Sequence, residues 1–434
     1  MRLLHVVGAG LLVVGFFGAL GTFPVRPLTA QPAGTGTDSA RYFDLRNYGA
    51  KCDGVTDDTS AFTAAIGAAA ALNGGIVSIP PSVQPCQITQ LSINTSYLTL
   101  QGAGMTDDNV SAVGPSRIRC TAASGACIRL ANLREVSNIV LRDLDIVGNA
   151  SLDYGLHFTG TGSGRACVRC RVERVAVHGF TKTGAVGIYH DNGVTNTFRN
   201  VYVYGNHDGM RIESELSTTV HLNGLLARAN KRYGLVIQDG PQQIVLDGVS
   251  VLESNGDAAV LVNMAAARSY GIILRDAFIG SNNTVSGTRQ LVFQGARGYD
   301  SRNVLLTGLY FSGSAAGATT TDIDLGGVHD VVVANIAGGA GPGGNIVKLQ
   351  STASEVHLYA VQASAGGAVD PDNRATLNLG YDGTLRLGAW TFSKLGSAPN
   401  GTIRFCADCT ASNPCGTGGT GAIAKRLNGV WVCN

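Results

Sequence analysis

Two acidic residues whose spacing fits a repeated strand are the strongest sign of chemistry in this chain. Asp191 and Glu213 lie 22 residues apart, and each directly follows a short strand-like segment, Gly187-Ile-Tyr-His190 or Gly209-Met-Arg-Ile212. If the two segments stack about 4.8 Å apart, the carboxylates reach separations suited to glycoside hydrolysis, about 5–5.5 Å for retention or about 6.5–9.5 Å for inversion. The spacing predicts Asp191 and Glu213 as the catalytic pair, with Asp208 as an alternative member.

The strand-like segments, written beneath one another, give two columns of side chains that should point outward. The first column holds His157, Tyr189, Arg211, Val236, Leu261 and Val292, and the second holds Thr159, Asp191, Glu213, Gln238, Asn263 and Gln294. The polar and ionisable members gather between residues 153 and 215. Because arginine pairs with carboxylates and aromatic rings stack on sugars, the substrate-binding neighbours are predicted to be His157, Tyr189, Arg199, His207 and Arg211.

The same residues also fit an elimination reaction. A polysaccharide lyase needs a base and a positive charge that neutralises the uronate, and Tyr189, His207 and Arg211 could supply them. His190 falls in an inward column, so it is expected to be a hydrogen-bonded core histidine. The sequence carries no dense acidic calcium cage, phosphate-binding loop or dinucleotide fingerprint, and we predict no metal and no cofactor.

These side chains must be positioned by a repeat that runs from residue 139 to 365. Its pattern is apolar, two residues, apolar, one residue, apolar, as in Leu141-Arg-Asp-Leu144-Asp-Ile146, and it recurs every 24 to 32 residues. The third position is held by Asp143, Arg174, Asn200, Gly224, Gly248, Asp276, Gly308, Asn335 and Ala360. Most are types that tolerate a left-handed turn. The pattern predicts an all-β parallel β-helix; an antiparallel sandwich fits poorly, because the same corner recurs in each copy.

Composition agrees with many short strands joined by tight turns. Glycine contributes 59 of the 434 residues, and charged residues only 14%, about half their usual share. This argues against a coiled coil, a helix bundle and a charged disordered chain. Removing residues 1–30, whose only charged residues are Arg2 and Arg26, lowers the net charge from +2 to zero. Nucleic acid is therefore not an expected partner.

The N-terminus predicts export. Residues 3–20 are mostly apolar, and the small Ala30 follows two prolines, as in a secretory signal peptide cleaved near residue 30. An uncleaved membrane anchor is the alternative; after cleavage no membrane association is expected. The chain holds ten cysteines, and behind an export signal an even count indicates disulfides. A zinc site formed by the last four cysteines is the alternative.

The segment that should cap the β-helix resembles a known family. A helix is expected to start near Ser60, with N-cap candidates just before it, and to be followed by a strand over Ile76–Ile79. Tyr48-Gly-Ala-Lys-Cys-Asp-Gly-Val-Thr-Asp-Asp-Thr-Ser-Ala-Phe62, then Gly74-Gly-Ile-Val-Ser-Ile-Pro80 and Leu98-Thr-Leu-Gln-Gly-Ala-Gly104, resemble the opening of the pectate lyase superfamily, in its rhamnogalacturonase/epimerase-like branch shared with phage tailspikes. The resemblance implies a right-handed β-helix and structural roles for Asp53, Asp57 and Asp58.

The expected organisation is a signal peptide over 1–30, the cap over 41–104, the β-helix over 105–365 and a small glycine- and cysteine-rich β module over 366–434. The module resembles tail modules of phage and exported bacterial proteins, so we expect a bacterial protein that is secreted or periplasmic. We predict an exported polysaccharide-degrading enzyme, a hydrolase before a lyase. The alternative is a non-catalytic, glycan-binding or structural spike, which would be expected to form a homotrimer. The polygalacturonase motif set is absent, apart from a partial echo in Arg211-Ile-Glu213.

Overall fold

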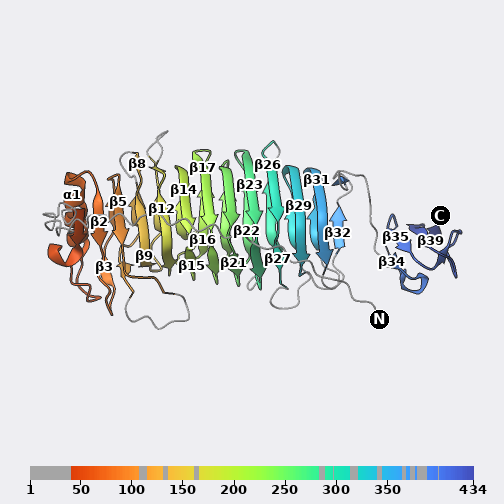
Figure 1. Cartoon of the computed structure of the whole chain (residues 1–434), viewed down its shortest axis with the longest axis horizontal. Helices are drawn as coiled ribbons and strands as arrows, with labels where there is room; N and C mark the ends of the chain where they lie inside the picture. Colours follow the sequence, from red (N-terminus) through yellow and green to blue (C-terminus); the bar gives the residue numbers. More distant parts are fainter. Residues whose placement is uncertain are drawn as a thin grey trace, which may run out of the picture. The chain divides into compact units, whose positions relative to one another are not determined.

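The chain folds into a parallel β-solenoid whose rungs follow one another in chain order (Figure 1). This computed structural model describes residues 41–434, apart from 107–114, 131–134, 161–165, 283–288, 297, 313–320, 340–344, 364–367, 372–376, 379–388 and 399. The solenoid is right-handed and almost wholly β, which confirms the predicted fold class. The predicted signal peptide lies outside the described residues. Within them, no helix has the length and apolarity needed to cross a membrane.

One sheet of the solenoid has 11 parallel strands and carries the polar residues predicted above. Its strands are β4 (Leu91–Ile93), β7 (Ala126–Leu130), β10 (Tyr154–Phe158), β13 (Val186–His190), β16 (Asp208–Glu213), β19 (Tyr233–Gln238), β22 (Ala258–Met264), β25 (Arg289–Gly295), β28 (Thr321–Leu325), β30 (Asn345–Leu349) and β32 (Ala368–Pro371). Each strand pairs in parallel with the equivalent strand of the next coil, so residues one coil apart lie about 4.8 Å from each other.

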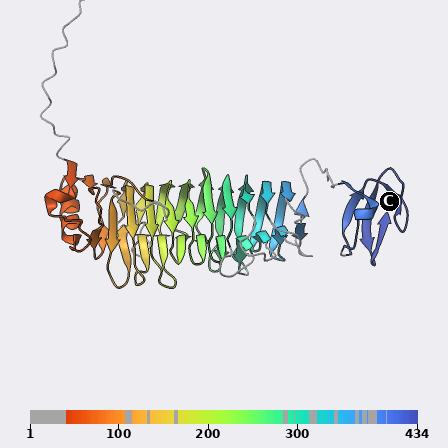
Figure 2. The same cartoon turned by 90° about the horizontal axis from the view of Figure 1, so that it is seen from below.

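The other sheet has 22 strands, because most coils contribute two legs separated by a corner. Its strands are β1 (Tyr42–Asp44), β2 (Gly75–Ser78), β3 (Cys86–Ile88), β5 (Leu98–Gln101), β6 (Arg117–Cys120), β8 (Val136–Ser137), β9 (Val140–Val147), β11 (Cys167–Val168), β12 (Arg171–His178), β14 (Gly193–Arg199), β15 (Tyr202–Tyr204), β17 (Ser217–Asn223), β18 (Leu226–Arg228), β20 (Gln242–Asp247), β21 (Ser250–Glu253), β23 (Ser269–Arg275), β24 (Ala277–Gly280), β26 (Ser301–Thr307), β27 (Tyr310–Phe311), β29 (Val328–Gly338), β31 (Ala353–Ala363) and β33 (Leu377–Asn378). Figure 2 shows the successive coils in a second view. The last strands, β32 and β33, lie beyond residue 365, where the sequence placed the end of the β-helix.

The corners have the conformation that the repeat predicts. Positive φ values between 49° and 71° occur at Asp143, Arg174, Asn200, Gly224, Gly248, Asp276, Gly308 and Asn335. A second series of left-handed corners was not predicted, and it includes Arg169, Thr195, Thr219, Gln243 and Glu355. Those residue types give no signal of a left-handed turn, since outside glycine it is mainly Asn and Asp that favour one.

A ladder of buried asparagines lines the inside of one turn. Its members are Asn206, Asn230, Asn255 and Asn282. The amide of Asn230 donates to the carbonyl of Val203, and its Oδ1 accepts from the backbone N–H of Asn206, so one side chain links neighbouring coils. Glycine is required beside the ladder, because a Cβ at Gly209 would lie 2.8 Å from Nδ2 of Asn230.

The N-terminal cap contains one α-helix, α1 (Thr59–Ala71), preceded by the 3-10 helix η2 (Leu45–Tyr48). α1 buries Phe62, Ala65, Ile66 and Ala69 at the end of the solenoid (Figure 1). The nearby acids are structural. Asp53 accepts from the backbone N–H groups of Val55 and Thr56, and Asp57 from that of Thr59. Asp58 is buried and accepts from the N–H groups of Lys51 and Cys52, although no side-chain bond caps the helix.

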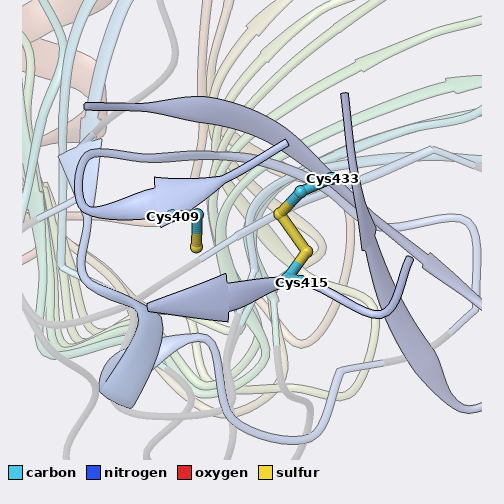
Figure 3. Close-up of side chains that lie close together, drawn as sticks. All are labelled: Cys409, Cys415 and Cys433. Atoms are coloured by element: carbon cyan, nitrogen blue, oxygen red, sulfur yellow. A yellow bond between two sulfur atoms is a disulfide. The ribbon is translucent and has the colours of Figure 1, made fainter. Parts of the chain in front are cut away.

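The C-terminal module is a small disulfide-linked β unit. Its elements are β34 (Ala389–Trp390), η3 (Phe392–Lys394), β35 (Ile403–Cys406), β36 (Cys409–Thr410), β37 (Gly416–Thr417), β38 (Ala422–Leu427) and β39 (Val430–Cys433). The structure pairs Cys406 with Cys409 and Cys415 with Cys433, and Figure 3 shows Cys409 beside the second disulfide. Disulfides Cys52–Cys86, Cys120–Cys127 and Cys167–Cys170 account for the other six cysteines, so the predicted disulfides, not the zinc alternative, are present.

Candidate functional site

The register of the 11-stranded sheet confirms the alignment of the first predicted column and of the second from Glu213 onward, although Val236, Leu261 and Val292 are buried and not exposed. In the first, His157, Tyr189, Arg211, Val236, Leu261 and Val292 are partners on six successive strands. In the second, Glu213, Gln238, Asn263 and Gln294 are partners in the same way. Asp191 joins that column, because it follows the pair His190–Ile212 and donates its backbone N–H to the carbonyl of Phe158. Asp191 and Glu213 therefore lie on adjacent rungs.

An aromatic stack forms the floor of this polar face. The rings of His157 and Tyr189 lie 4.9 Å apart and nearly parallel, and Tyr154 packs on both at 4.5 and 4.8 Å. Tyr154 was not predicted, although its place at the start of β10 is visible in the repeat. The stack holds the rings of His157 and Tyr189 in place. As a result, Nε2 of His157 faces Asp191 and the phenol oxygen of Tyr189 faces Glu213.

Tyr189 and Glu213 form the first of two acid–base pairs. The phenol of Tyr189 donates to Oε2 of Glu213 at 2.9 Å, across two neighbouring strands. Burial, reinforced by the negative charges of Glu213 and Asp191, raises the pKa of Tyr189 well above its usual range. Tyr189 therefore keeps its proton at neutral pH, and Glu213 receives a hydrogen bond of fixed direction.

His157 and Asp191 form the second pair. Nε2 of His157 lies 3.5 Å from Oδ2 of Asp191. The Asp191 side chain is 30% exposed, whereas that of His157 is 11% exposed. Asp191 is therefore the more accessible member of the pair, and His157 lies behind it.

The third predicted acid, Asp208, has a different place. Its side chain is fully buried, at 0% exposure. One oxygen accepts from Arg211 at 2.6 Å, and Arg232, on the next coil, contacts both oxygens at 3.0 and 2.7 Å. Asp208 is too buried to contact a polymer at the surface, and its contacts orient the two arginines.

His207 and Arg199 were also predicted to bind substrate, and they lie in different places. Nδ1 of His207 lies 3.6 Å from Asp208, and burial lowers the pKa of His207 despite that neighbour. Arg199 does not join the face. It ends β14 in the 22-stranded sheet, where its partners are Glu173 and Asn223. The prediction failed at Arg199 because the chain turns onto the other sheet after β13.

His190 is a core residue, as predicted. It is completely buried, and the amide of Asn196 donates to its Nε2 at 3.0 Å, which leaves Nδ1 as the donor to Oγ of Ser217 at 3.0 Å. Burial lowers the pKa of His190 to about 4. Its imidazole is therefore neutral at physiological pH and takes no part in the face outside.

An apolar cluster borders the polar face on the C-terminal side. Val236, Ala258, Leu261 and Val292 are buried together, with Tyr233 packed against them. The polar face thus covers the rungs of β10, β13 and β16 and the start of β19. Within the described residues it contains no cluster of metal-ligating side chains. One group that could hold an ion, His329, Asp330 and Glu355, lies on the 22-stranded sheet.

Comparison with known proteins agrees with this architecture. The family model described as rhamnogalacturonase A/epimerase, pectate lyase-like, matches residues 42–258. Two Azotobacter vinelandii mannuronan C5-epimerases, AlgE6 and AlgE2, are 28% and 29% identical over 51% of this chain, but the match spans only 29% and 26% of their lengths.

Solved structures show the same fold at lower identity. The A-module of A. vinelandii mannuronan C-5 epimerase AlgE4 has a TM-score of 0.60 at 21% identity, covering 78% of this chain and 100% of that one. The Dettilon tailspike protein has a TM-score of 0.55 at 12% identity, covering 76% and 68%. The match of the family model over half of the chain decides the assignment: this chain belongs to the rhamnogalacturonase A/epimerase, pectate lyase-like family.

Proposed function

We propose that the chain is an exported enzyme that hydrolyses a polysaccharide on the face formed by β10, β13 and β16. The observation that carries the proposal is the placement of Asp191 and Glu213 on adjacent rungs of one outward column, each beside a ring of the neighbouring column. A glycoside hydrolase uses two carboxyl groups about 5–9.5 Å apart, and side chains on adjacent rungs, whose backbones lie about 4.8 Å apart, can reach such a separation. Export is supported by five disulfides, which persist in oxidising compartments.

Each residue has a role that follows from its contacts. Glu213 accepts the phenol hydrogen of Tyr189, and this bond holds the carboxylate in one orientation, which suits it to act as the nucleophile or base. Asp191 would give a proton to the leaving glycosidic oxygen as the C–O bond breaks, with His157 as the group that resupplies it. Water adds to the anomeric carbon and completes the hydrolysis. The stacked Tyr154 and Tyr189 rings offer a surface for sugars.

Proton transfer at a uronate, by epimerisation or elimination, is the second candidate. The phenol of Tyr189 is hydrogen-bonded to Glu213, so a proton can pass between the two groups, and the guanidinium of Arg211 lies 5.8 Å from the centre of the Tyr189 ring, where it could neutralise a sugar carboxylate. The names of the epimerase relatives add support for this reaction.

The deciding experiment is incubation of the purified chain with pectic, algal and bacterial polysaccharides, with three readouts. New reducing ends alone indicate hydrolysis. Reducing ends with ultraviolet absorbance of unsaturated uronates indicate elimination, and inverted C5 signals in the proton NMR spectrum indicate epimerisation. Binding with no product on any polysaccharide would contradict an enzymatic function and favour the spike interpretation, which a homotrimer in light scattering would further support.

A further inference from the structure

We infer that Arg211 and Arg232, held by Asp208, form a binding subsite for an anionic group of the glycan. The inference rests on the proposed function for the identity of the ligand as a sugar, but its geometry is separate from the carboxylate pair. The three residues come from two successive coils: Asp208 and Arg211 lie on β16, and Arg232 immediately precedes β19. The two arginines are here called the arginine fork.

The buried carboxylate explains how the fork is built. Asp208 is completely buried and its two oxygens are used by the two guanidinium groups. A buried charge requires such partners, because desolvation without them is very unfavourable. One negative charge and two positive charges leave the three residues with a net charge of +1; Lys231 adds a positive charge nearby and Asp257 a negative one, so the local balance stays positive.

The donors that Asp208 does not use can serve a ligand. Each guanidinium presents several N–H groups in one plane, and Asp208 occupies only some of them. The Nε–H of Arg211 is buried with no hydrogen-bond partner among the described residues. The Arg232 side chain is 39% exposed, compared with 18% for Arg211. Arg232 is therefore the arginine of the pair that is more accessible to a ligand in solution.

The rings beneath the fork indicate that its ligand is carried on a sugar. Arg211 lies over Tyr189, and Arg232 lies 4.9 Å from the ring centre of Tyr233. Both rings belong to the 11-stranded sheet, and Tyr233 on β19 lies two rungs beyond Tyr189 on β13, so the fork extends the aromatic floor in the C-terminal direction. A planar carboxylate of a uronate fits the donor planes of arginine, and a sulfate ester on a sugar has the same chemistry.

The test is direct binding at low ionic strength, with methyl glucuronide, inorganic sulfate and methyl glucoside as separate probes. Titration followed through the arginine Nε signals in 15N NMR reports the fork itself. We expect both anions to bind and to shift the Arg211 signal, and the neutral glucoside to bind at least tenfold more weakly. Stronger binding of the glucuronide than of sulfate would identify a uronate as the ligand, and the reverse order would identify a sulfate ester. Equal binding of the glucoside would overturn the inference.

Variants separate the fork from general charge. Arg232→Gln should weaken anion binding at least tenfold, whereas Arg275→Gln, an equal charge change on β23 of the other sheet, should leave it unchanged. Asp208→Asn makes the site more positive by one charge, yet it should weaken binding because the arginines lose their common anchor. Tighter binding to Asp208→Asn, or unchanged binding to Arg232→Gln, would contradict the fork.

The two proposals can fail separately. Anion binding that depends on Arg232, in a chain that changes no polysaccharide, would retain the fork and reject the enzymatic function. If the wild-type chain turns over a polysaccharide but the Arg232→Gln variant binds anions normally, the enzymatic function is retained and the arginine fork is rejected. Thermal melting of each variant, compared with the wild-type chain, shows whether a loss of binding comes from unfolding.

Discussion

The phenol of Tyr189 donates to Glu213 at 2.9 Å, from one rung of the solenoid to the next. The contact depends on the register of β13 and β16. In that register Tyr189 lies opposite Arg211, two residues before Glu213. Tyr189 thus reaches diagonally from one outward column to the other, and it orients a carboxylate that its own strand does not carry.

Removing that hydrogen bond should slow the reaction more than it weakens the fold. A hydrogen bond to a charged group contributes about 1.5–3 kcal/mol, so Tyr189→Phe is expected to lower turnover by about 10- to 100-fold, with substrate binding little changed. Rates and binding measured on the best substrate check this. Tyr270→Phe, on β23 of the other sheet, is the matched control and should keep the full rate. A full rate in Tyr189→Phe would mean that Glu213 needs no orienting donor.

Acid should destabilise the chain through two histidines, the buried His190 and the half-buried His178, whose pKa values are lowered. Burial lowers the pKa of His190 and of His178 to about 4, whereas an unfolded histidine titrates near 6.5. Below about pH 6.5 the unfolded chain therefore binds protons at these histidines that the folded chain does not bind. Stability falls as the pH decreases toward about 4, by on the order of 3 kcal/mol for a fully buried residue such as His190.

Denaturant unfolding at several pH values between 7 and 5 measures this dependence. His190→Phe should make the dependence shallower by about one bound proton, whatever its effect on absolute stability. His190→Phe leaves Asn196 and Ser217 without their partner, so a lower stability at neutral pH is also expected. An unchanged slope in the variant would show that His190 accepts a proton while folded.

The asparagine ladder should be sensitive to the loss of one member. Asn230→Ala removes the bonds to Val203 and Asn255 and leaves buried polar groups without partners, each costing about 1–3 kcal/mol. We expect the free energy of unfolding to fall by at least about 2 kcal/mol. The exposed Asn303 also has a positive φ, of 53°, and Asn303→Gly should change stability by less than about 0.5 kcal/mol. Equal effects of the two substitutions would argue against the ladder.

The disulfide pattern predicts a peptide map. Digestion of the unreduced chain should yield linked peptides joining Cys52 to Cys86 and Cys415 to Cys433, and the short-range pairs should appear as intact loops. Metal analysis of the same sample should find no stoichiometric zinc. Zinc released together with free thiols from the last four cysteines would restore the alternative that the sequence left open.

The sequence predicted the columns of the site because each coil repeats the same strand at nearly the same spacing. His157, Tyr189 and Arg211 could be aligned by counting from the glycine that opens each segment. The Asn ladder carried an equally regular signal, since Asn206, Asn230 and Asn255 recur every 24 or 25 residues. Core positions are expected to be apolar, however, and the hydrogen bonds that allow these asparagines to be buried are visible only in the structure.

Other features could not be predicted, because they depend on how loops meet between coils. Arg232 lies outside both columns, and its bond to Asp208 follows from the close approach of the start of β16 and the segment that precedes β19. Arg199 was misplaced although the corner repeat itself includes it, one residue before the third-position Asn200, which puts it on the 22-stranded sheet. Side-chain contacts across coils require the register of both segments, which a single sequence does not provide.

The central claim is that Asp191 and Glu213 perform chemistry on a polysaccharide, and the most direct test compares rates of product formation. Wild-type chain, Asp191→Asn, Glu213→Gln and Glu173→Gln, a control on β12 of the other sheet, would be assayed on each polysaccharide that the wild type binds. The account predicts product from the wild type and from Glu173→Gln, and at least a 100-fold loss in both site variants with binding and melting temperature retained. No product from the wild type on any bound polysaccharide, or full rates in both site variants, would contradict it.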